Sequence, residues 1–295
     1  MRFIVTGASG YVGRFLCRRL VNSGHHVTAI SRRGVYIEGV NSLCHDFSIE
    51  GEISLFPASV DVAINLVAQS NLGGAYDYFE INRDIPARLV SMCDTHDVRR
   101  IIHVSTIGVH GVSTKGRGAF SEADAPNPSL GDTYAISKLA GELAVVDTCK
   151  GKTIEYTILR PPAVYGPGAS TFGKLVSLVR SGIPLPLAGI GNANSYLGIH
   201  NLVDCLLACA ASSNAANETF VVSDGTTIST PDLAREIAIV LGISSRQFYL
   251  PDQLVPVRAL KSSLAINSNK IRAFLNWSPP VSFRDGLKEA VEAFS

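Results

Sequence analysis

Tyr134 and Lys138 are two side chains that could exchange protons with a substrate. They occupy positions i and i+4 of the segment Tyr134-Ala135-Ile136-Ser137-Lys138, and on a helix this spacing places both on one face, about 5–6 Å apart at Cβ. A free tyrosine has a pKa near ~10 and is a poor acid or base at neutral pH. A neighbouring ammonium favours the phenolate and lowers that pKa. The pair therefore predicts an acid–base tyrosine, provided that a second motif places a reactant beside it.

A glycine-rich segment near the N-terminus supplies this second motif. Gly7-Ala8-Ser9-Gly10-Tyr11-Val12-Gly13 follows an apolar run and precedes an amphipathic helix pattern. Glycines in this arrangement allow a tight turn, a close approach of the backbone to a pyrophosphate, and close packing of helix on strand. The helix N-terminus then offers unpaired N–H groups and the positive end of its dipole to phosphates. We therefore expect dinucleotide binding, with cofactor contacts from Gly7, Ser9, Gly10, Tyr11, Val12 and Gly13.

The end of the second expected strand bears on which dinucleotide is bound. NAD sites usually carry an acidic residue about 20 residues past the glycines, on the ribose hydroxyls, but here the chain reads Ser31-Arg32-Arg33. A carboxylate would repel a 2′-phosphate, whereas a hydroxyl and a guanidinium can hold one. We therefore expect NADP in preference to NAD, with Ser31, Arg32 and Arg33 among the cofactor-binding residues. The alternative is that both arginines are solvated loop residues.

The combination of motifs resembles the extended branch of the short-chain dehydrogenase/reductase superfamily, the NAD-dependent epimerase/dehydratase family. The segments that carry the resemblance are Thr6–Gly13 (cofactor loop), His103–Gly111 (Ser/Thr-bearing strand), Tyr134–Lys138 (catalytic helix), Arg160–Gly168 (the loop that follows), and Asn201–Asp204 and Lys270–Trp277 (C-terminal lobe). They cover nearly the whole chain, in order. The resemblance implies an enzyme that uses NAD or NADP.

The resemblance also assigns roles to residues at matching positions. Thr106 corresponds to the catalytic Ser/Thr, with Ser105 as a competing hydroxyl. Tyr134 corresponds to the acid–base, and Lys138 to the residue that holds the nicotinamide ribose and tunes the tyrosine. Tyr134 and Lys138 therefore also count as cofactor contacts, and the others implied by the family are Asp46, Phe47, Leu66, Val67, Ala68, Asn82, Pro161 and Val164.

Two positions depart from the nucleotide-sugar enzymes of this family. Such enzymes usually have an arginine against the substrate pyrophosphate where this chain has Asn194, and often an asparagine before a helix where it has Thr171. The cations that are candidates to replace the lost charge, unless they are solvated loop residues, are Lys115, Arg117 and Arg258. The first two lie in the connection Gly111–Asp132, which we expect to be a mobile rim of the substrate cleft.

The expected function is reduction of the 4-keto group of a nucleotide-sugar, with Tyr134 donating the proton and Thr106 hydrogen-bonding the carbonyl oxygen. The alternatives are a nucleotide-sugar 4-epimerase that uses the same residues, a reductase of a non-nucleotide ketone, and a non-catalytic dinucleotide sensor. An epimerase keeps its cofactor bound and oxidised, so a preference for NADP favours a reductase. A dehydratase is disfavoured, because Ile107-Gly108 lacks the acidic pair that such enzymes use for elimination.

Short apolar runs and longer helical patterns alternate over the first 160 residues and must position these side chains. Strands are expected at Arg2–Thr6, Val27–Ser31, Leu43–Phe47, Val62–Val67, Arg100–Ser105 and Thr153–Leu159. Helices are expected at Gly10–Val21, Tyr76–Thr95 and Thr133–Cys149. Repeated β-α-β units with apolar strands predict an α/β fold, a doubly wound parallel sheet of the Rossmann type with helices on both faces.

After Arg160, prolines and glycines divide the chain into shorter pieces. Helices are expected at Phe172–Arg180, Leu202–Ala211, Pro231–Leu241, Asn269–Leu275 and Phe283–Phe294. We expect a dinucleotide-binding domain with the catalytic helix over residues 1–165 and a smaller substrate-binding lobe over residues 166–295, partly interleaved with the sheet. Helices 76–95 and 133–149 pair with their copies in relatives, and their apolar residues exceed one sheet-facing stripe, which predicts a homodimer.

Composition and charge exclude several classes of protein. The chain has 295 residues, of which 46% are hydrophobic, and its net charge of +1 gives no electrostatic footprint for nucleic acid or an anionic membrane. The longest apolar stretch, Leu202–Ala211, is too short for a membrane span, and we see no targeting segment. Six scattered cysteines without a CxxC motif, and histidines without metal spacing, predict reduced thiols in a cytoplasmic protein and no metal site.

Overall fold

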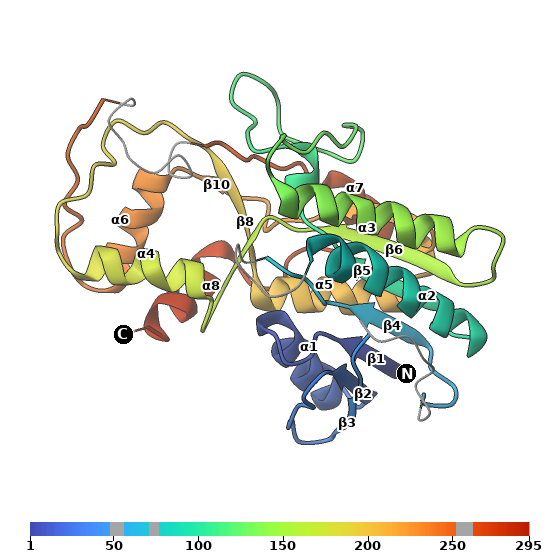
Figure 1. Cartoon of the computed structure of the whole chain (residues 1–295). Coiled ribbons are helices and arrows are strands. Elements are labelled where there is room, and N and C mark those ends of the chain that lie inside the picture. The colour runs from blue at the N-terminus through green and yellow to red at the C-terminus, as the bar shows by residue number, and fades with distance from the viewer. Residues whose placement is uncertain (48–55, 71–76, 252–261, 295) are drawn as a thin grey trace.

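Seven parallel strands form the main sheet within the part of the computed structural model that can be described, residues 1–47, 56–70, 77–251 and 262–294 (Figure 1). In spatial order they are β3 (Val40–Cys44), β2 (His26–Ser31), β1 (Arg2–Thr6), β4 (Val62–Asn65), β5 (Arg100–Val104), β6 (Glu155–Arg160) and β9 (Glu218–Val221). The strand order reverses between β1 and β4, and in an open parallel sheet a crevice forms at the carboxyl ends of such strands. The predicted doubly wound α/β fold is confirmed.

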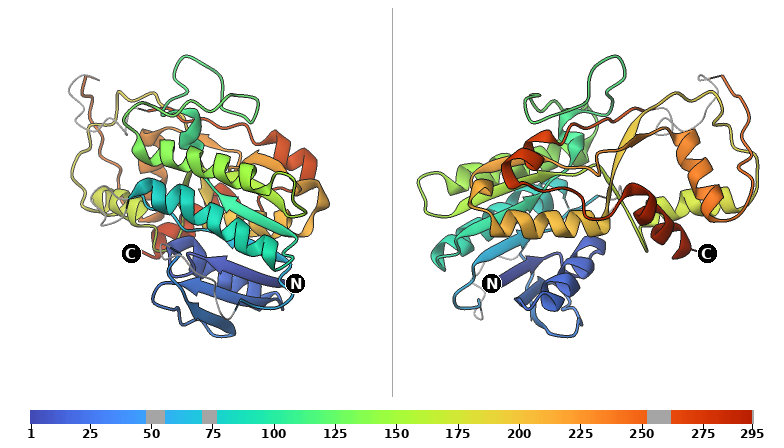
Figure 2. Two further views of the ribbon diagram at one scale, coloured as in Figure 1. Left: turned by 45° about the vertical axis from the view of Figure 1, so that its right-hand side comes forward. Right: turned by 180° about the vertical axis from the view of Figure 1, so that it is seen from behind.

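Helices cover both faces of this sheet, which is why its central strands are apolar. α1 (Tyr11–Asn22) and α5 (Ile199–Ala211) share one core, to which α7 (Asn269–Leu275) also contributes. α2 (Ile85–Thr95) and α3 (Thr133–Cys149) pack on the opposite face (Figures 1 and 2). In the described ranges, no helix is long and apolar enough to cross a membrane.

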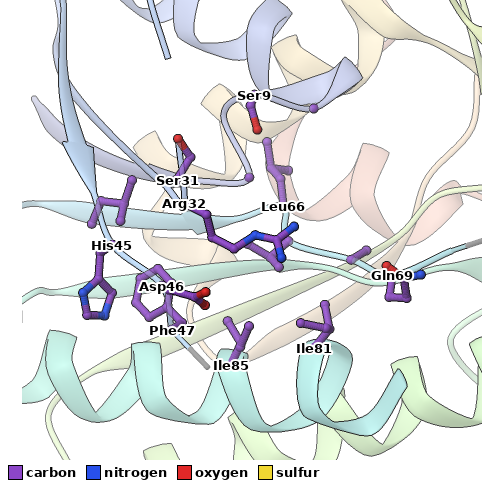
Figure 3. Close-up of a pocket in the computed structure, with 15 residues that line it drawn as sticks. Ser9, Ser31, Arg32, His45, Asp46, Phe47, Leu66, Gln69, Ile81 and Ile85 are labelled. Carbon is purple, nitrogen blue, oxygen red and sulfur yellow. The ribbon is translucent and has the colours of Figure 1, made fainter. Parts of the chain in front are cut away.

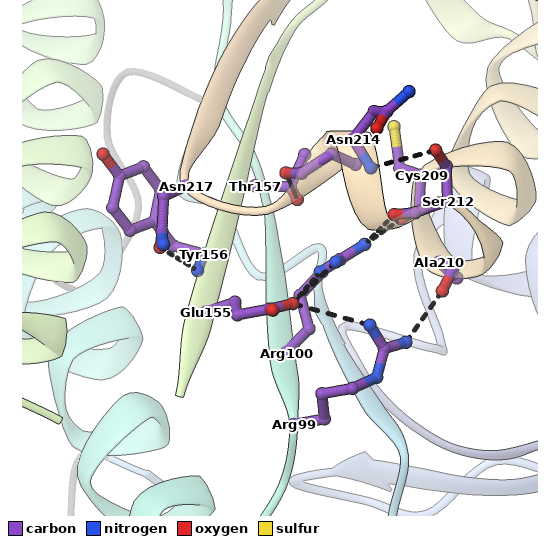
Figure 4. Close-up of polar contacts among 11 residues, drawn as sticks. Arg99, Arg100, Glu155, Tyr156, Thr157, Cys209, Ala210, Ser212, Asn214 and Asn217 are labelled. Carbon is purple, nitrogen blue, oxygen red and sulfur yellow. Dashed lines mark hydrogen bonds and ion pairs between the residues drawn. The ribbon is translucent and has the colours of Figure 1, made fainter. Parts of the chain in front are cut away.

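A buried arginine ties α5 to the amino end of the sheet (Figure 4). The side chain of Arg100 is fully buried, and its Nε and one terminal nitrogen donate to Glu155 Oε2 at 2.8 and 2.6 Å. The other terminal nitrogen donates to the carbonyls of Cys209 and Ser212, both at 2.6 Å. These carbonyls lie at the C-terminal end of α5, where the helix dipole favours a cation. The guanidinium therefore has a partner for each of its three nitrogens.

The C-terminal part of the chain adds a smaller lobe beside the carboxyl ends of the strands (Figures 1 and 2). Its sheet has the order β10 (Thr227–Ile228), β8 (Asn194–Gly198), β7 (Ala163–Tyr165). Its helices are α4 (Ser170–Arg180), α6 (Thr230–Val240) and α8 (Phe283–Glu292), which share a core that includes Val176, Ile237 and Leu287. The helices were predicted to within a few residues, whereas β7, β8, β9 and β10 were not predicted.

Two elements differ from their predicted form. The strand expected at Leu43–Phe47 is instead β3, Val40–Cys44, so the following residues lie in a loop beyond the sheet edge. The helix expected at Tyr76–Thr95 is helical from Tyr78 and contains the π-helical segment η1 (Glu80–Asp84), which runs into α2. Tyr76 lies outside the described residues. The backbones of η1 and α3 approach each other so closely that a Cβ added to Gly141 of α3 would lie 2.0 Å from Asn82 O.

Candidate active site

A cavity of about 210 Å³ opens at the carboxyl ends of β1, β2 and β4, where the strand order reverses (Figure 3). Its lining includes many of the residues predicted to bind a cofactor, namely Gly7, Ser9, Gly10, Ser31, Arg32, Asp46, Phe47, Leu66, Val67 and Ala68. These residues come from the glycine loop and from the chain just after β2, β3 and β4. The predicted cofactor segments therefore converge on one cavity although they are far apart in sequence.

Backbone packing fixes the glycine loop. Gly7 has a φ of 72°, and a Cβ added to it would lie 2.7 Å from the carbonyl carbon of Leu66 after β4. A Cβ on Gly13, inside α1, would lie 2.4 Å from Gly7 O. A side chain at either position would force backbone apart, since contacts below 3.0 Å require a shift. The first turn of α1 has no side-chain cap and no acidic residue, so its N–H groups are available to a phosphate.

The far end of the cavity combines a hydroxyl, a cation and a carboxylate. Ser31 Oγ is buried without a hydrogen-bond partner among the described residues, which suits a ribose hydroxyl. Arg32 and Asp46 both project into the cavity (Figure 3). Arg33 is exposed and lies outside the cavity lining. These donors and acceptors, together with the free helix N-terminus, fit the ribose and pyrophosphate of a dinucleotide.

Several lining residues were missed by the sequence analysis. They are Ile30, His45, Gln69, Ile81 and Ile85. His45 directly precedes the predicted pair at 46–47, and Gln69 directly follows the predicted run 66–68, so extending each motif by one residue would have found them. Ile81 and Ile85 are four apart on the segment that faces the sheet, a spacing that also marks ordinary core residues.

The catalytic side chains expected from the sequence come from the end of β5 and the start of α3. Lys138 Nζ donates to Val104 O at 2.7 Å, which ties α3 to the last residue of β5. Thr106 follows shortly after, and a Cβ added to Gly108 would lie 3.5 Å from both Thr106 Oγ1 and the Cβ of Ala135. Thr106 is therefore close to the first turn of α3, where Tyr134 lies.

The two candidate hydroxyls on this strand end differ in accessibility. Thr106 is partly exposed and its Oγ1 accepts a hydrogen bond from Gly108 N at 3.2 Å, which leaves its own O–H free to donate. Ser105 is only 4% exposed, and its Oγ is buried without a partner among the described residues. A hydroxyl that meets substrate must be reachable from the cleft, so accessibility supports Thr106.

The protonation of the Tyr134–Lys138 pair differs from the expectation that the lysine lowers the tyrosine pKa. Burial, followed by the charges of Asp132 and Tyr78, raises the pKa of Tyr134 to about 12. Burial also lowers the pKa of Lys138 to about 8, against an opposing effect of Glu142. The ammonium is itself buried and donates to Val104 O. In the protein alone, desolvation outweighs the attraction of the lysine for a phenolate.

Asn82 connects the cavity wall to the catalytic helix. Its Oδ1 accepts from Gln69 N at 2.8 Å, and its Nδ2 donates to Gln69 O at 3.0 Å and to Ser137 Oγ at 2.8 Å. Asn82 is fully buried and therefore positions Gln69 rather than lining the cavity itself.

Other predicted cofactor residues are not among the residues that line the cavity. Tyr11, Val12 and Val164 pack against the core beneath α1 and α5. Pro161 is buried, and its carbonyl accepts from Ile107 N at 2.9 Å beside Thr106. Gly13 packs against the glycine loop as described above. The described residues show no group of three or more His, Cys, Asp or Glu that could hold a metal ion.

Two of the residues considered for the substrate pyrophosphate, Asn194 and Arg117, are engaged elsewhere. Asn194 lies in β8, and its Oδ1 accepts from Leu264 N at 2.9 Å. Arg117 pairs with Asp124 and lies over the ring of Phe120, with its guanidinium carbon 4.3 Å from the centroid. Lys115 and Thr171 are exposed, and Arg258 lies outside the described residues.

The connection Gly111–Asp132, expected as a mobile rim, is anchored to the C-terminal part of the chain. Phe120 is 2% exposed, and its N–H donates to Ala265 O at 2.9 Å. Thr114 N likewise donates to Ser263 O at 2.6 Å. These contacts were invisible in the sequence because the partners are about 150 residues apart.

Comparisons with known proteins agree with this geometry. The model of the NAD dependent epimerase/dehydratase family matches residues 3–223. The UDP-glucose 4-epimerase of Vibrio cholerae is 30% identical over 312 aligned positions, which cover 99% of this chain and 94% of that protein. The 2-alkyl-3-oxoalkanoate reductase of Stenotrophomonas maltophilia is 25% identical over 253 positions, covering 82% of this chain and 76% of that protein. Among solved structures, UDP-glucuronic acid 4-epimerase from Bacillus cereus in complex with NAD has a TM-score of 0.83 at 23% identity, covering 100% of this chain and 98% of that one.

Proposed function

Because this chain belongs to the NAD dependent epimerase/dehydratase family, we propose that it is a nucleotide-sugar 4-epimerase that works with a tightly held NAD. The observation that carries the proposal is its similarity to the V. cholerae UDP-glucose 4-epimerase, which extends over almost the full length of both chains. The 4-ketoreductase expected from Ser31-Arg32-Arg33 becomes the second candidate.

The proposed roles follow from the positions of the side chains. When bound, NAD supplies an acceptor and then a donor of hydride for the sugar carbon. Tyr134 takes the proton of the sugar hydroxyl and later returns it, and Thr106, with its free O–H, holds the same oxygen. Since burial raises the pKa of Tyr134 to about 12, the phenol needs added positive charge to act as a base near neutral pH. Lys138 and the oxidised nicotinamide ring are the two sources of that charge.

The charges of the cavity support NAD over NADP. Arg32 is a cation suited to a 2′-phosphate, but Asp46 brings a carboxylate into the same cavity (Figure 3). A carboxylate near the ribose disfavours a 2′-phosphate by like-charge repulsion. Arg33, expected as a second cation for this phosphate, is exposed outside the cavity.

The test uses the purified protein without added cofactor. The protein is denatured and the released nucleotide is identified, and native protein is incubated with UDP-glucose. We expect release of NAD and formation of UDP-galactose. Release of no nucleotide, together with NADPH oxidation that matches product one for one on a keto substrate, would replace the epimerase by a reductase.

The reductase of a non-nucleotide ketone, a further alternative from the sequence, has two observations in its favour. The chain is 25% identical to a 2-alkyl-3-oxoalkanoate reductase, and Asn194 provides no charge for a pyrophosphate. A β-keto acid assayed with NADPH and with NADH distinguishes this candidate from the epimerase. Turnover of the β-keto acid, with no turnover of any nucleotide-sugar, would establish the non-nucleotide reductase.

We also propose a homodimer through α2 and α3. Leu143 of α3 is 57% exposed, whereas Val145 of the same helix is fully buried, so α3 carries apolar surface beyond the side that packs on the sheet. Light scattering at micromolar concentration checks this. Leu143→Glu should then yield monomers with an unchanged far-UV spectrum, and a wild-type monomer would contradict the proposal.

A further inference from the structure

Three polar side chains lie side by side in the sheet, beneath the catalytic helix. Thr6, Asn65 and His103 are paired in register on β1, β4 and β5, and each is fully buried. The residues two positions before them, Ile4, Ala63 and Ile101, belong to the core under α2 and α3, so the three side chains face the same helices. We refer to Thr6, Asn65 and His103 as the polar row.

The hydrogen bonds of the polar row fix the orientation of the Asn65 amide. Its Oδ1 accepts from Thr6 Oγ1 at 2.7 Å and from Val67 N at 3.2 Å. A backbone N–H can only donate, so the atom that meets Val67 must be the oxygen. The amide Nδ2 therefore faces His103 Nδ1, at 2.9 Å.

This orientation in turn fixes the tautomer of His103. The Asn65 Nδ2 group can only donate, so His103 Nδ1 must accept, and the ring proton is on Nε2. Burial, together with the charge of Lys138, lowers the pKa of His103 well below its usual value. The ring is therefore neutral at physiological pH, with Nε2–H as its donor.

His103 lies close enough to Lys138 for the charge of the lysine to act on its pKa, and its Nε2–H group remains without a partner in the polar row. His103 Nε2 is buried and has no hydrogen-bond partner among the described residues. Val104, the next residue, accepts the hydrogen bond of Lys138 Nζ. An unsatisfied buried donor costs about 1–3 kcal/mol, and strands with apolar neighbours would ordinarily carry an apolar side chain here.

We propose that His103 is a positioning residue for the acid–base pair, held by Asn65 as an uncharged Nε2–H donor beneath Lys138. Because the ring cannot accept a proton without losing its hydrogen bond from Asn65, no second positive charge arises under the ammonium. Burial then lowers the pKa of Lys138 and Glu142 raises it, with no added effect from a charged His103. This inference rests on the roles given to Tyr134 and Lys138 in the proposed function.

The polar row also connects His103 to the cofactor cavity. Thr6 directly precedes Gly7, and Val67, whose N–H is held by Asn65, lines the cavity. Glu142 of α3 is the charged group that acts on the pKa of Lys138. Glu142 is paired with Arg160 of β6 at 2.6 Å, and Arg160 also contacts the ring of His110 at 3.0 Å. His103 is thus the titratable neighbour of Lys138 whose charge the row controls directly.

The first measurement is nitrogen NMR of the wild-type protein labelled in histidine. We expect one histidine that carries its proton on Nε2 and does not titrate between pH 5 and pH 9, and that is absent from His103→Gln. A His103 ring that carries the proton on Nδ1, or that titrates near its usual pKa, overturns the proposal. This measurement needs no substrate, so its result does not depend on whether the protein acts on a nucleotide-sugar.

The decisive variant is Asn65→Asp. A carboxylate can only accept, so it draws a proton onto His103 Nδ1 and creates an imidazolium beneath Lys138. We expect the titration of Lys138, followed by carbon NMR of labelled lysine in the NAD-saturated protein, to fall by about one pH unit. The acidic limb of kcat should move to lower pH in the same direction.

The matched control is the double variant Asn65→Asp/His103→Gln. A glutamine cannot become charged, so the titration of Lys138 should not fall in this variant. Equal shifts in the single and double variants would show that the new carboxylate acts directly and would overturn the role of His103. A change in stability alone, with no shift of the Lys138 titration in Asn65→Asp, would also overturn it.

Discussion

The two ends of the main sheet treat buried polar groups in opposite ways. At the amino end, each nitrogen of the fully buried Arg100 guanidinium donates to Glu155 or to the terminal carbonyls of α5 (Figure 4). At the carboxyl end, Ser31 Oγ, His103 Nε2 and Ser105 Oγ are buried without partners among the described residues. Lys138 is also fully buried, and its ammonium donates to Val104 O.

This difference separates structure from function. A buried charge whose hydrogen bonds are all made contributes to holding two elements together, and removing one partner is costly. Buried groups left without partners lower stability and are retained where a ligand or a reaction uses them. We therefore expect substitutions at the amino end to change folding with little effect on chemistry, and substitutions at the carboxyl end to change chemistry.

The largest effect is expected from Tyr134→Phe. Removing the phenolic oxygen removes the proton transfer, so kcat should fall by about 10²–10⁴-fold. The free energy of unfolding and the affinity for NAD should remain close to those of the wild type, because the ring is kept. Steady-state kinetics, NAD titration and urea unfolding check the three quantities. A kcat near the wild-type value would remove Tyr134 from its role.

The matching change at the amino end is Glu155→Ala. It leaves Arg100 buried with the two carbonyl acceptors of α5 but without its counter-ion, so the free energy of unfolding should fall by about 2–4 kcal/mol. Under conditions where the variant is folded, kcat should be unchanged, since the substitution lies at the opposite end of the sheet from Tyr134. Urea unfolding and kinetics at low temperature measure both. A large loss of kcat in the folded variant would contradict the division of the two ends.

Lys138→Met tests whether the carboxyl end trades stability for function. The pKa of Lys138 falls from 10.5 to about 8 in the folded protein, so at pH 7 the buried ammonium costs about 3 kcal/mol. After loss of the hydrogen bond to Val104, the variant should be about 2 kcal/mol more stable at pH 7 while its kcat falls.

The sign of the pH dependence follows from the same lowered pKa. Between pH 8 and 10.5 the unfolded chain binds a proton at Lys138 that the folded chain lacks, so stability gains from this group as pH rises through that window. Lys138→Met should remove this gain. Urea unfolding at pH 7, 8, 9 and 10 measures the free energy of unfolding of the wild type and of Lys138→Met. An equal pH dependence in the two proteins would show that the lysine is not desolvated.

The smallest effect is expected from Arg32→Ala, with Arg33→Ala as its control. A charge-assisted hydrogen bond to a 2′-phosphate is worth about 1.5–3 kcal/mol, and the nearby Asp46 reduces that gain. Affinity for NADP should therefore fall about tenfold in Arg32→Ala with affinity for NAD unchanged. Arg33→Ala should alter neither, because Arg33 is exposed outside the cavity. Calorimetry measures the affinity of each variant for NAD and for NADP. Equal effects of the two substitutions would contradict the assignment of Arg32 to the 2′-phosphate.

Local sequence signals determined the cofactor half of this protein. The glycine loop, the residues after β2, β3 and β4, and the Tyr134–Lys138 spacing each lie within a few residues, so their chemistry could be recognised without a structure. The parallel sheet also followed from the sequence, because apolar strands separated by helical patterns have few other arrangements. The roles of the individual residues and the division near residue 165 stay predictions.

Tertiary structure decided what depends on contacts between distant segments. The short strands β7, β8 and β10 gain their hydrogen bonds only from partners elsewhere in the chain, so their two to five residues carry too little local pattern. The tautomer of His103 depends on Asn65, 38 residues away, and the raised pKa of Tyr134 depends on how deeply α3 is packed. Residue type and spacing thus determined which groups are present, whereas desolvation and long-range hydrogen bonds determined their protonation, because both arise only when the chain is folded.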